Sequence, residues 1–207
     1  MQLLRDNRLF FLAGALYLLV GAALLLALEH GEAILFFSGK RDATGDAFFR
    51  HWTRLGEVPA YLLLCLVFLF VRARHSLSFA IIGGLAAVIS LGTKWLFARR
   101  RPRLFFEDQN LLDTINLADG VTLDDLYTGA NSFPSGHTLS AFALYTYLAL
   151  ILPEKRYAGL ACFTVALLVA VSRIYLVQHF LEDVYVGAML GTLLGWGVYR
   201  WRGAGAV

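Results

Sequence analysis

The chain has 207 residues, of which 58% are hydrophobic and only 16% charged, and its formal net charge is +3. A soluble domain is about a quarter charged, so this composition excludes an ordinary soluble domain and indicates a membrane protein. Membrane topology and one site account for most of the cations, and no nucleic-acid partner is needed to explain them.

The first apolar run, Leu9–Leu28, contains twenty residues without a charged or strongly polar side chain. At 1.5 Å per residue it measures about 30 Å, which is enough to cross the hydrocarbon core of a bilayer. It is longer than the apolar region of a signal peptide, and Glu29 and His30 follow it in place of a small-residue cleavage site. We therefore expect a retained membrane-spanning helix.

Five further apolar runs predict spanning helices, because backbone groups in lipid need hydrogen-bond partners within the protein. They are Val58–Val71, Leu77–Phe97, His137–Leu152, Tyr157–Val177 and Val184–Trp201. The second run is short for a span, so its helix is expected to start before Gly56. The predicted fold class is an all-α integral membrane bundle of six helices, built as a single domain over residues 1–207.

Three features accompany these helices. Residues Ala47–Gly56 place aromatic side chains at helical spacing among cations, which is typical of a short helix at the membrane surface. The Asp-rich stretch Phe105–Phe133 is expected to be partly helical, within a loop of residues 98–136 that caps a site. A ridge of glycines in the last helix predicts close helix packing. The ridge consists of Gly187, Gly191 and Gly195.

Basic residues predict the orientation, because Lys and Arg collect in cytoplasmic loops. Eight cations lie at the termini and at two short turns, all on one face if there are six spans. They are Arg5, Arg8, Arg72, Arg74, Lys155, Arg156, Arg200 and Arg202. Asp6 and Glu154 oppose them there, whereas ten cations and thirteen acids fall on the other face. The termini are therefore expected in the cytoplasm and the larger loops outside, which in a bacterial inner membrane is the periplasm.

Three groups of polar residues stand at outward helix ends, where charges are costly and usually functional. In the first group Lys94 and Arg101 are seven residues apart, so a helix would place them on one face. Pro102 is expected to stop that helix and to hold Arg101 extended. The alternative interpretation is ordinary snorkelling of basic side chains to the interface.

The second group is the tetrapeptide Pro134-Ser135-Gly136-His137, at the start of the fourth predicted helix. Proline suits a first helical turn, and glycine lets a ligand approach the backbone. The free N–H groups of a helix start form an anion site, to which Ser135 adds a hydroxyl and His137 a proton donor. The alternative is a capped helix start with an interfacial histidine.

The third group contains Ser172, Arg173, His179 and Asp183. On a helix, a spacing of four lets the Asp183 carboxylate reach the His179 imidazole, whose other nitrogen is then presented as a nucleophile or base. Arg173 offers a forked phosphate donor. A structural histidine is the simpler interpretation of His179 alone. Two histidines, an aspartate and three cations on one membrane face together indicate an active site that handles an anion.

In chain order, these three groups resemble the signature of the type 2 phosphatidic acid phosphatase family, the lipid phosphate phosphatases, in its bacterial membrane branch. The family shares its site with the soluble vanadium haloperoxidases. All three parts match, and the six-helix layout extends the resemblance over most of the chain. The signature is specific for the superfamily and not for the substrate.

The resemblance implies an outward-facing lipid phosphate phosphatase without metal or cofactor, acting on undecaprenyl diphosphate, phosphatidylglycerophosphate or phosphatidate. His179 would attack phosphorus and form a phosphohistidine, Asp183 would hold its tautomer, and His137 would protonate the leaving oxygen and then activate water. The remaining residues would hold the phosphate oxygens. They are Lys94, Arg101, Arg173, Ser135 and Gly136.

Other functions stay open. A lipid A phosphatase fits the same residues, and so does a phosphotransferase that passes phosphate to an acceptor other than water. A haloperoxidase is disfavoured because those enzymes are soluble. A transporter or lipid-phosphate binder is disfavoured because the chain lacks clear inverted repeats and its charges lie at one face, not at the bilayer midplane. The oligomeric state does not follow from the sequence.

Overall fold

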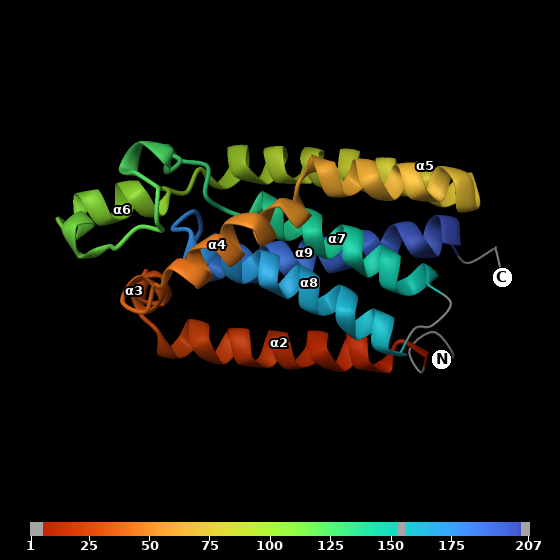
Figure 1. Cartoon of the computed structure of the whole chain (residues 1–207), viewed down its shortest axis with the longest axis horizontal. Coiled ribbons are helices and arrows are strands. Elements are labelled where there is room, and N and C mark those ends of the chain that lie inside the picture. Colours follow the sequence, from red (N-terminus) through yellow and green to blue (C-terminus); the bar gives the residue numbers. More distant parts are fainter. Residues whose placement is uncertain (1–5, 153–155, 204–207) are drawn as a thin grey trace.

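The structure is a computed structural model that describes residues 6–152 and 156–203. Figure 1 shows a bundle of long helices with short helices gathered at one end. The elements are α2 (Arg8–Ala27), α3 (Glu32–Ser38), α4 (Ala43–Trp52), η1 (Thr53–Gly56), α5 (Val58–Phe97), α6 (Pro102–Asp108), η2 (Leu112–Thr114), η3 (Leu123–Asp125), α7 (Gly136–Ile151), α8 (Arg156–Tyr175), α9 (Leu181–Val198) and the π-helical turn η4 (Tyr199–Gly203). No strand occurs within the described ranges, and the all-α prediction is confirmed.

Three of the described helices, α2, α5 and α8, are long and apolar enough to cross a membrane, and α7 is a shorter apolar helix. Helix α5 consists of two halves, because Arg72 leaves helical geometry (φ −155°, ψ 93°) and the chain folds back on itself (Figure 1). The halves pack side by side, with the rings of Phe68 and Phe79 5.2 Å apart between centroids. The count of six spans remains a prediction.

Helix starts differ from the sequence predictions by more than one residue at three places. The first half of α5 starts at Val58 and not before Gly56, because Glu57 is extended and Pro59 is tolerated only in a first turn. The second half starts directly after Arg72 and not at Leu77. Helix α9 starts at Leu181, three residues before the predicted Val184. This last shift places Asp183 inside the first turn of α9.

The predicted surface features are present as helices. The interfacial segment forms α4 and the 3₁₀ turn η1, starting at Ala43 instead of Ala47. The loop of residues 98–136 contains α6, η2 and η3, so the expectation of a partly helical loop is confirmed.

The segments that carry the predicted cytoplasmic cations lie at the same end of the bundle. The start of α2, the break in α5, the start of α8 and the end of α9 are all opposite α6 (Figure 1). In agreement, Arg74 donates a hydrogen bond to the Arg202 carbonyl. Arg5, Glu154 and Lys155 lie outside the described residues.

Helix α7 forms the centre of the bundle. Eleven of its sixteen residues are buried, on all sides of the helix, which is the pattern of a helix surrounded by other helices. By contrast, α2 buries only Phe10 and Gly21, so most of its apolar surface is left to face lipid.

The glycine ridge of α9 packs directly on α7, as predicted. A Cβ atom at Gly191 would overlap the carbonyl oxygen of Leu139 and lie 2.8 Å from Cβ of Phe142. A Cβ at Gly187 would lie 2.8 Å from the Ser135 carbonyl oxygen. The two backbones therefore touch, and this contact sets the distance between the starts of α7 and α9.

A buried carboxylate connects the short helices to the bundle. Asp46 of α4 accepts hydrogen bonds from the Tyr175 hydroxyl at 2.7 Å, the Asp119 N–H at 2.7 Å and Arg41 at 3.2 Å. Burial raises the pKa of the Asp46 carboxyl, but these three donors outweigh burial and hold its pKa below the ordinary value of 3.8. The interaction links α4 to the end of α8 and to the loop of residues 98–136.

We expect Gly191→Ala to destabilise the protein, because the new methyl group must push α9 away from α7. Overpacking of this kind costs about 1–3 kcal/mol. Gly197→Ala is the matched control in the same helix, since a Cβ there has no neighbour within 4 Å, and it should be neutral or slightly stabilising. Thermal unfolding in detergent measures both variants, and equal midpoints would contradict the helix contact.

Asp46→Asn should lower the free energy of unfolding at neutral pH by about 2 kcal/mol, the typical contribution of hydrogen bonds to a charged group. Because the folded-state pKa is depressed, this stabilisation is present above the unfolded pKa of about 4 and is lost as the pH falls through the folded value. Unfolding from pH 7 down to pH 3 should therefore show the two proteins converging at the acid end. A constant difference would contradict the role of the charge.

Candidate active site

The turn between α8 and α9 carries His179, and the end of α8 holds its backbone. The N–H groups of Gln178 and His179 both donate to the Arg173 carbonyl, at 2.9 and 3.2 Å. Val177 has a positive φ of 57°, which reverses the chain. The imidazole is thereby fixed in the interior, with 2% of the residue exposed.

Asp183 reaches His179 from the first turn of α9 and not along one continuous helix, so the expected helical geometry of this pair is wrong. Its Oδ2 lies 3.1 Å from Nδ1 of His179 and accepts the N–H of Phe180, the N-cap residue, at 3.0 Å. The Ser132 hydroxyl also donates to Oδ2. The predicted pair is present because α9 begins early enough to place its first-turn carboxylate beside the turn.

Arg101 faces the other ring nitrogen of His179. Its Nη1 lies 3.2 Å from Nε2 of His179 and 2.9 Å from the Gln178 carbonyl oxygen, and its Nε donates to Oδ1 of Asn131 at 2.8 Å. A guanidinium has donors only, so this network assigns the lone pair to Nε2 and the hydrogen to Nδ1, which donates to Asp183. Nε2 is therefore the ring nitrogen whose lone pair can act as a nucleophile or base.

Burial, together with the charges of Arg101, Arg173 and Lys94, lowers the pKa of His179 well below its usual 6.5. The imidazole is consequently neutral at pH 7. Neutral imidazole is the form that carries a free lone pair for attack on an electrophile.

The second motif joins the start of α7 to the start of α9. Ser135 is the N-cap of α7, so Pro134 precedes the helix and does not open it as expected. The Ser135 Oγ accepts from the Thr138 hydroxyl at 2.9 Å, and the Ser135 N–H donates to the Asp183 carbonyl at 3.0 Å. The hydroxyl hydrogen of Ser135 is still available to a ligand, because a hydroxyl is both donor and acceptor.

Gly136 makes room for the end of α5. A Cβ atom there would lie 2.8 Å from Oγ of Ser90 and 3.6 Å from Nζ of Lys94. The ammonium of Lys94 is thus close to the backbone at the start of α7, where free N–H groups point outward.

Lys94 and Arg101 do not share a helix face, contrary to the sequence prediction. Helix α5 ends at Phe97, before a left-handed Ala98 (φ 43°). Arg101 is the extended N-cap of α6, and Pro102 begins that short helix. The two cations still interact electrostatically, because the loop folds back over the end of α5.

Arg173 is the most enclosed of the three cations, with 4% of the residue exposed. Its Nη1 donates to Oγ1 of Thr53 at 2.8 Å, and its Nε has no hydrogen-bond partner among the described residues. Thr53 comes from η1, far from any of the three motifs in sequence.

His137 pairs with Glu57, the N-cap residue of α5. Its Nε2 lies 3.2 Å from Oε1 of Glu57, and the two side chains are 27% and 38% exposed. His137 also lies within the electrostatic range of the cations and of His179. It is the more accessible of the two histidines.

The structure brings together all eight predicted residues, from α5, the loop, α7, α8, the α8–α9 turn and α9. They are Lys94, Arg101, Ser135, Gly136, His137, Arg173, His179 and Asp183. Sequence reasoning missed four of their partners: Thr53, Glu57, Asn131 and Ser132. Asn131 and Ser132 directly precede the Phe133–His137 segment, and this position next to a motif was a usable signal. No signal in the sequence pointed to Thr53 or Glu57.

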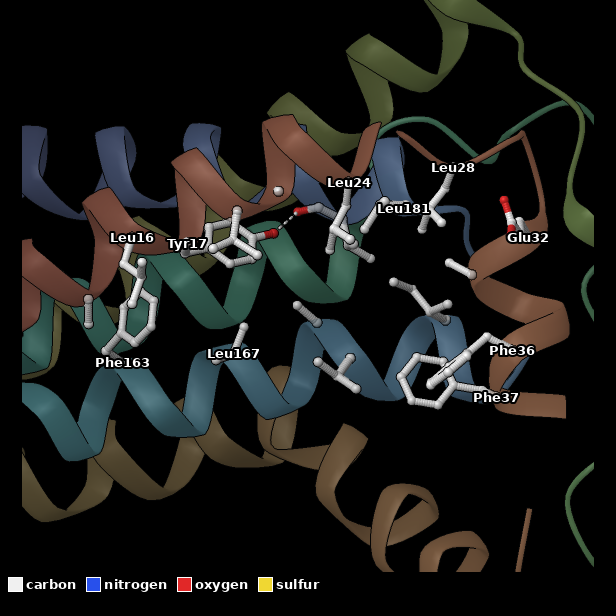
Figure 2. A pocket seen from close by; sticks show the side chains of 18 residues that line it. Leu16, Tyr17, Leu24, Leu28, Glu32, Phe36, Phe37, Phe163, Leu167 and Leu181 are labelled. Carbon is white, nitrogen blue, oxygen red and sulfur yellow. Dashed lines mark hydrogen bonds between the residues drawn. The ribbon is translucent and has the colours of Figure 1, made fainter. Parts of the chain in front are cut away.

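An apolar cavity of about 610 Å³ lies between α2, α3, α8 and the start of α9 (Figure 2). The Tyr17 hydroxyl donates to the Val184 carbonyl at its wall, at 3.3 Å. None of the eight predicted residues lines this cavity. It is separate from the polar site, and its lining suits hydrocarbon chains.

Comparison with known proteins gives a consistent picture. A family model described as the PAP2 superfamily matches residues 74–205. The chain is 31% identical over 175 residues to lipid phosphate phosphatase 1 of Arabidopsis thaliana. The matched region covers 70% of this chain and 53% of that protein. The chain thus spans about half the length of this curated relative.

Two solved structures have a similar fold. Aquifex aeolicus LpxE superposes with a TM-score of 0.66 at 28% identity, covering 82% of this chain and 93% of that one. A transmembrane PAP2 type phosphatidylglycerolphosphate phosphatase from Bacillus subtilis superposes with a TM-score of 0.67 at 24% identity, covering 95% and 97%. The second likeness concerns the fold alone.

The convergence of three cations predicts that inorganic phosphate stabilises the folded protein. Phosphate at a hundred times its Kd should add about 2.7 kcal/mol to the stability, seen as a rise in the thermal midpoint. Lys94→Met should reduce this rise, whereas Lys40→Met, which removes a cation lying over the Phe36 ring, should not. Equal rises in all three proteins would show that phosphate binds elsewhere.

Proposed function

The chain belongs to the PAP2 superfamily, and from this premise we propose that it is an integral membrane lipid phosphate phosphatase that works through a phosphohistidine on His179 without a metal ion. The observation that carries the proposal is the arrangement around that imidazole. Asp183 accepts from Nδ1, and Arg101 lies 3.2 Å from Nε2.

In the first step, the Nε2 lone pair of His179 attacks phosphorus, and the bond from phosphorus to the leaving oxygen breaks. The Nδ1–H stays on the ring and donates to Asp183, which offsets the positive charge that develops. His137 gives its proton to the leaving oxygen, so the product leaves as a neutral hydroxyl group or as a protonated phosphate.

In the second step, neutral His137 takes a proton from water, and the resulting hydroxide attacks phosphorus. The bond between phosphorus and Nε2 of His179 breaks, and inorganic phosphate leaves with the protein restored to its starting form. The same residue acts first as acid and then as base, as microscopic reversibility requires.

The three cations support the proposal because phosphoryl transfer depends mainly on positioning and charge stabilisation. Lys94, Arg101 and Arg173 would hold the equatorial oxygens together with the hydroxyl of Ser135 and the N–H of Gly136. Removing one such donor typically costs about 10²–10³ in rate.

The substrate class follows from the setting of the site among apolar helices. We propose a phosphate monoester or diphosphate of a membrane lipid, such as phosphatidate, phosphatidylglycerophosphate or undecaprenyl diphosphate. The similarity to lipid phosphate phosphatase 1 supports this class. A lipid A phosphatase and a transferase to another acceptor are the alternatives that a substrate panel separates.

The proposed location is a bacterial inner membrane, with cytoplasmic termini and the site facing the periplasm. Basic residues gather at the end of the bundle that contains the break in α5, and the polar site lies at the opposite end. By the positive-inside rule, this distribution supports a site that faces outward.

Phosphate release from a panel of lipid phosphates, by detergent-purified protein in excess EDTA, tests the function. We expect release in EDTA, and a fall of at least about 10³-fold in His179→Ala because the nucleophile is removed. His51→Ala removes an exposed imidazole of α4 and should leave the rate unchanged. Radiolabelled lipid should leave acid-labile label on the wild type and none on His179→Ala.

Release that EDTA stops would overturn the metal-free mechanism. Folded protein that releases nothing from any lipid would overturn the phosphatase proposal. Acceptor-dependent loss of free phosphate would instead identify a transferase.

A further inference from the structure

The segment Thr53–Glu57 lies against the site, although it precedes both the three motifs and the family match at residues 74–205. It consists of the turn η1 and the N-cap residue of α5. Its residues come from the polar stretch that follows α4, and two of them contact residues of the site. Thr53 contacts Arg173 of the third motif, and Glu57 contacts His137 of the second.

The segment is held firmly in place. A Cβ atom at Gly56 would lie 2.9 Å from the His137 carbonyl oxygen and 2.8 Å from Cγ1 of Val169, so the chain there presses against both α7 and α8. The Leu55 carbonyl accepts from the Tyr145 hydroxyl at 3.2 Å. The position of Glu57 is therefore determined by the same helices that carry the site.

From this position the Glu57 carboxylate meets one nitrogen of His137. Oε1 lies 3.2 Å from Nε2, and a carboxylate accepts, so the hydrogen is on Nε2. Nδ1 of His137 has no hydrogen-bond partner among the residues that the structure describes. The second nitrogen is thus the one available to a substrate.

His137 is surrounded mainly by positive charge. The charged and titratable groups around it are Glu57 and Lys94 from the two ends of α5, Arg101 from the loop, Arg173 from α8 and His179 from the turn. The carboxylate of Asp183 in α9 is hydrogen-bonded to His179 and not to His137. Glu57 is consequently the one carboxylate among these groups that directly opposes the cations at His137.

We infer that Glu57 is a positioning residue that orients His137 through Nε2 and stabilises its protonated form, so that Nδ1 can act as acid and then as base. This inference rests on the proposed function. In the cycle Nε2–H stays bonded to Glu57 throughout, while Nδ1 gives its proton to the leaving oxygen and regains one from water. The imidazole of His137 therefore ends the cycle with the same protons with which it began.

The test compares the wild type with Glu57→Gln and Glu57→Asp in the phosphate-release assay across pH. In Glu57→Gln we expect kcat to fall about 10- to 100-fold, a part of the 10²–10⁴ that acid–base catalysis supplies. KM should change little, because the phosphate-holding cations are intact. The alkaline limb of the kcat/KM profile, which reports loss of the acid's proton, should move about one unit to lower pH.

Glu57→Asp keeps the charge on a shorter side chain, so it should restore the position of the alkaline limb and part of kcat. Glu107→Gln removes an exposed carboxylate of α6 and serves as the matched charge control, with an unchanged profile. Thermal unfolding of each variant shows that the protein is folded.

Wild-type activity separates the two proposals. If the wild type releases phosphate and Glu57→Gln, folded, keeps the wild-type pH profile and kcat, the role of Glu57 is overturned while the phosphatase function stands. A loss of kcat that Glu57→Asp does not relieve, without a shift of the profile, would assign Glu57 a structural role and also overturn the inference. If the folded wild type releases no phosphate from any lipid, the proposed phosphatase function itself is overturned.

Discussion

The backbone contact between α7 and α9 is the constraint on which the rest of the structure depends. Glycines at every fourth position of α9 let the two helices touch, and Gly191 packs on the carbonyl of Leu139. Their starts are then close enough for the Ser135 N–H to donate to the Asp183 carbonyl. This hydrogen bond brings two motifs together at one end of the bundle. A wider spacing would separate the two histidines that the proposed chemistry needs.

The charges at the site end of the bundle are mainly positive, which favours binding of an anion. Three cations converge in a largely buried region, and Asp183, which is fully buried, is engaged with His179. Burying like charges is costly unless a partner offsets them, and a phosphate group is such a partner. Burial, together with the same cations, lowers the pKa of His179 and keeps its imidazole neutral. In the proposed reaction, one arrangement would therefore hold the phosphate oxygens and preserve the lone pair for attack.

The elements outside the central helices act as a frame for the site. The carboxylate of Asp46 ties α4 to the loop of residues 98–136 and to the end of α8, and the segment that follows α4 delivers Thr53 and Glu57 to Arg173 and His137. Segments that the sequence analysis treated as surface features therefore contact two residues of the candidate site. The helical core thus carries most of the candidate site residues, and the surrounding frame supplies their hydrogen-bond partners.

The sequence alone determined the all-α membrane class, the positions of the long helices to within a few residues, and the eight residues of the candidate site. Apolar runs are readable because lipid forces local, helical hydrogen bonding. The motif residues are readable because charges at the ends of spanning helices are costly and usually functional. Tertiary structure decided what local pattern does not contain. Asp183 meets His179 from the first turn of α9, Lys94 comes within electrostatic range of Arg101 from a separate helix, and Glu57 meets His137 across 80 residues. The geometry of these contacts depends on how helices pack and where loops return, and spacing along the chain does not determine it.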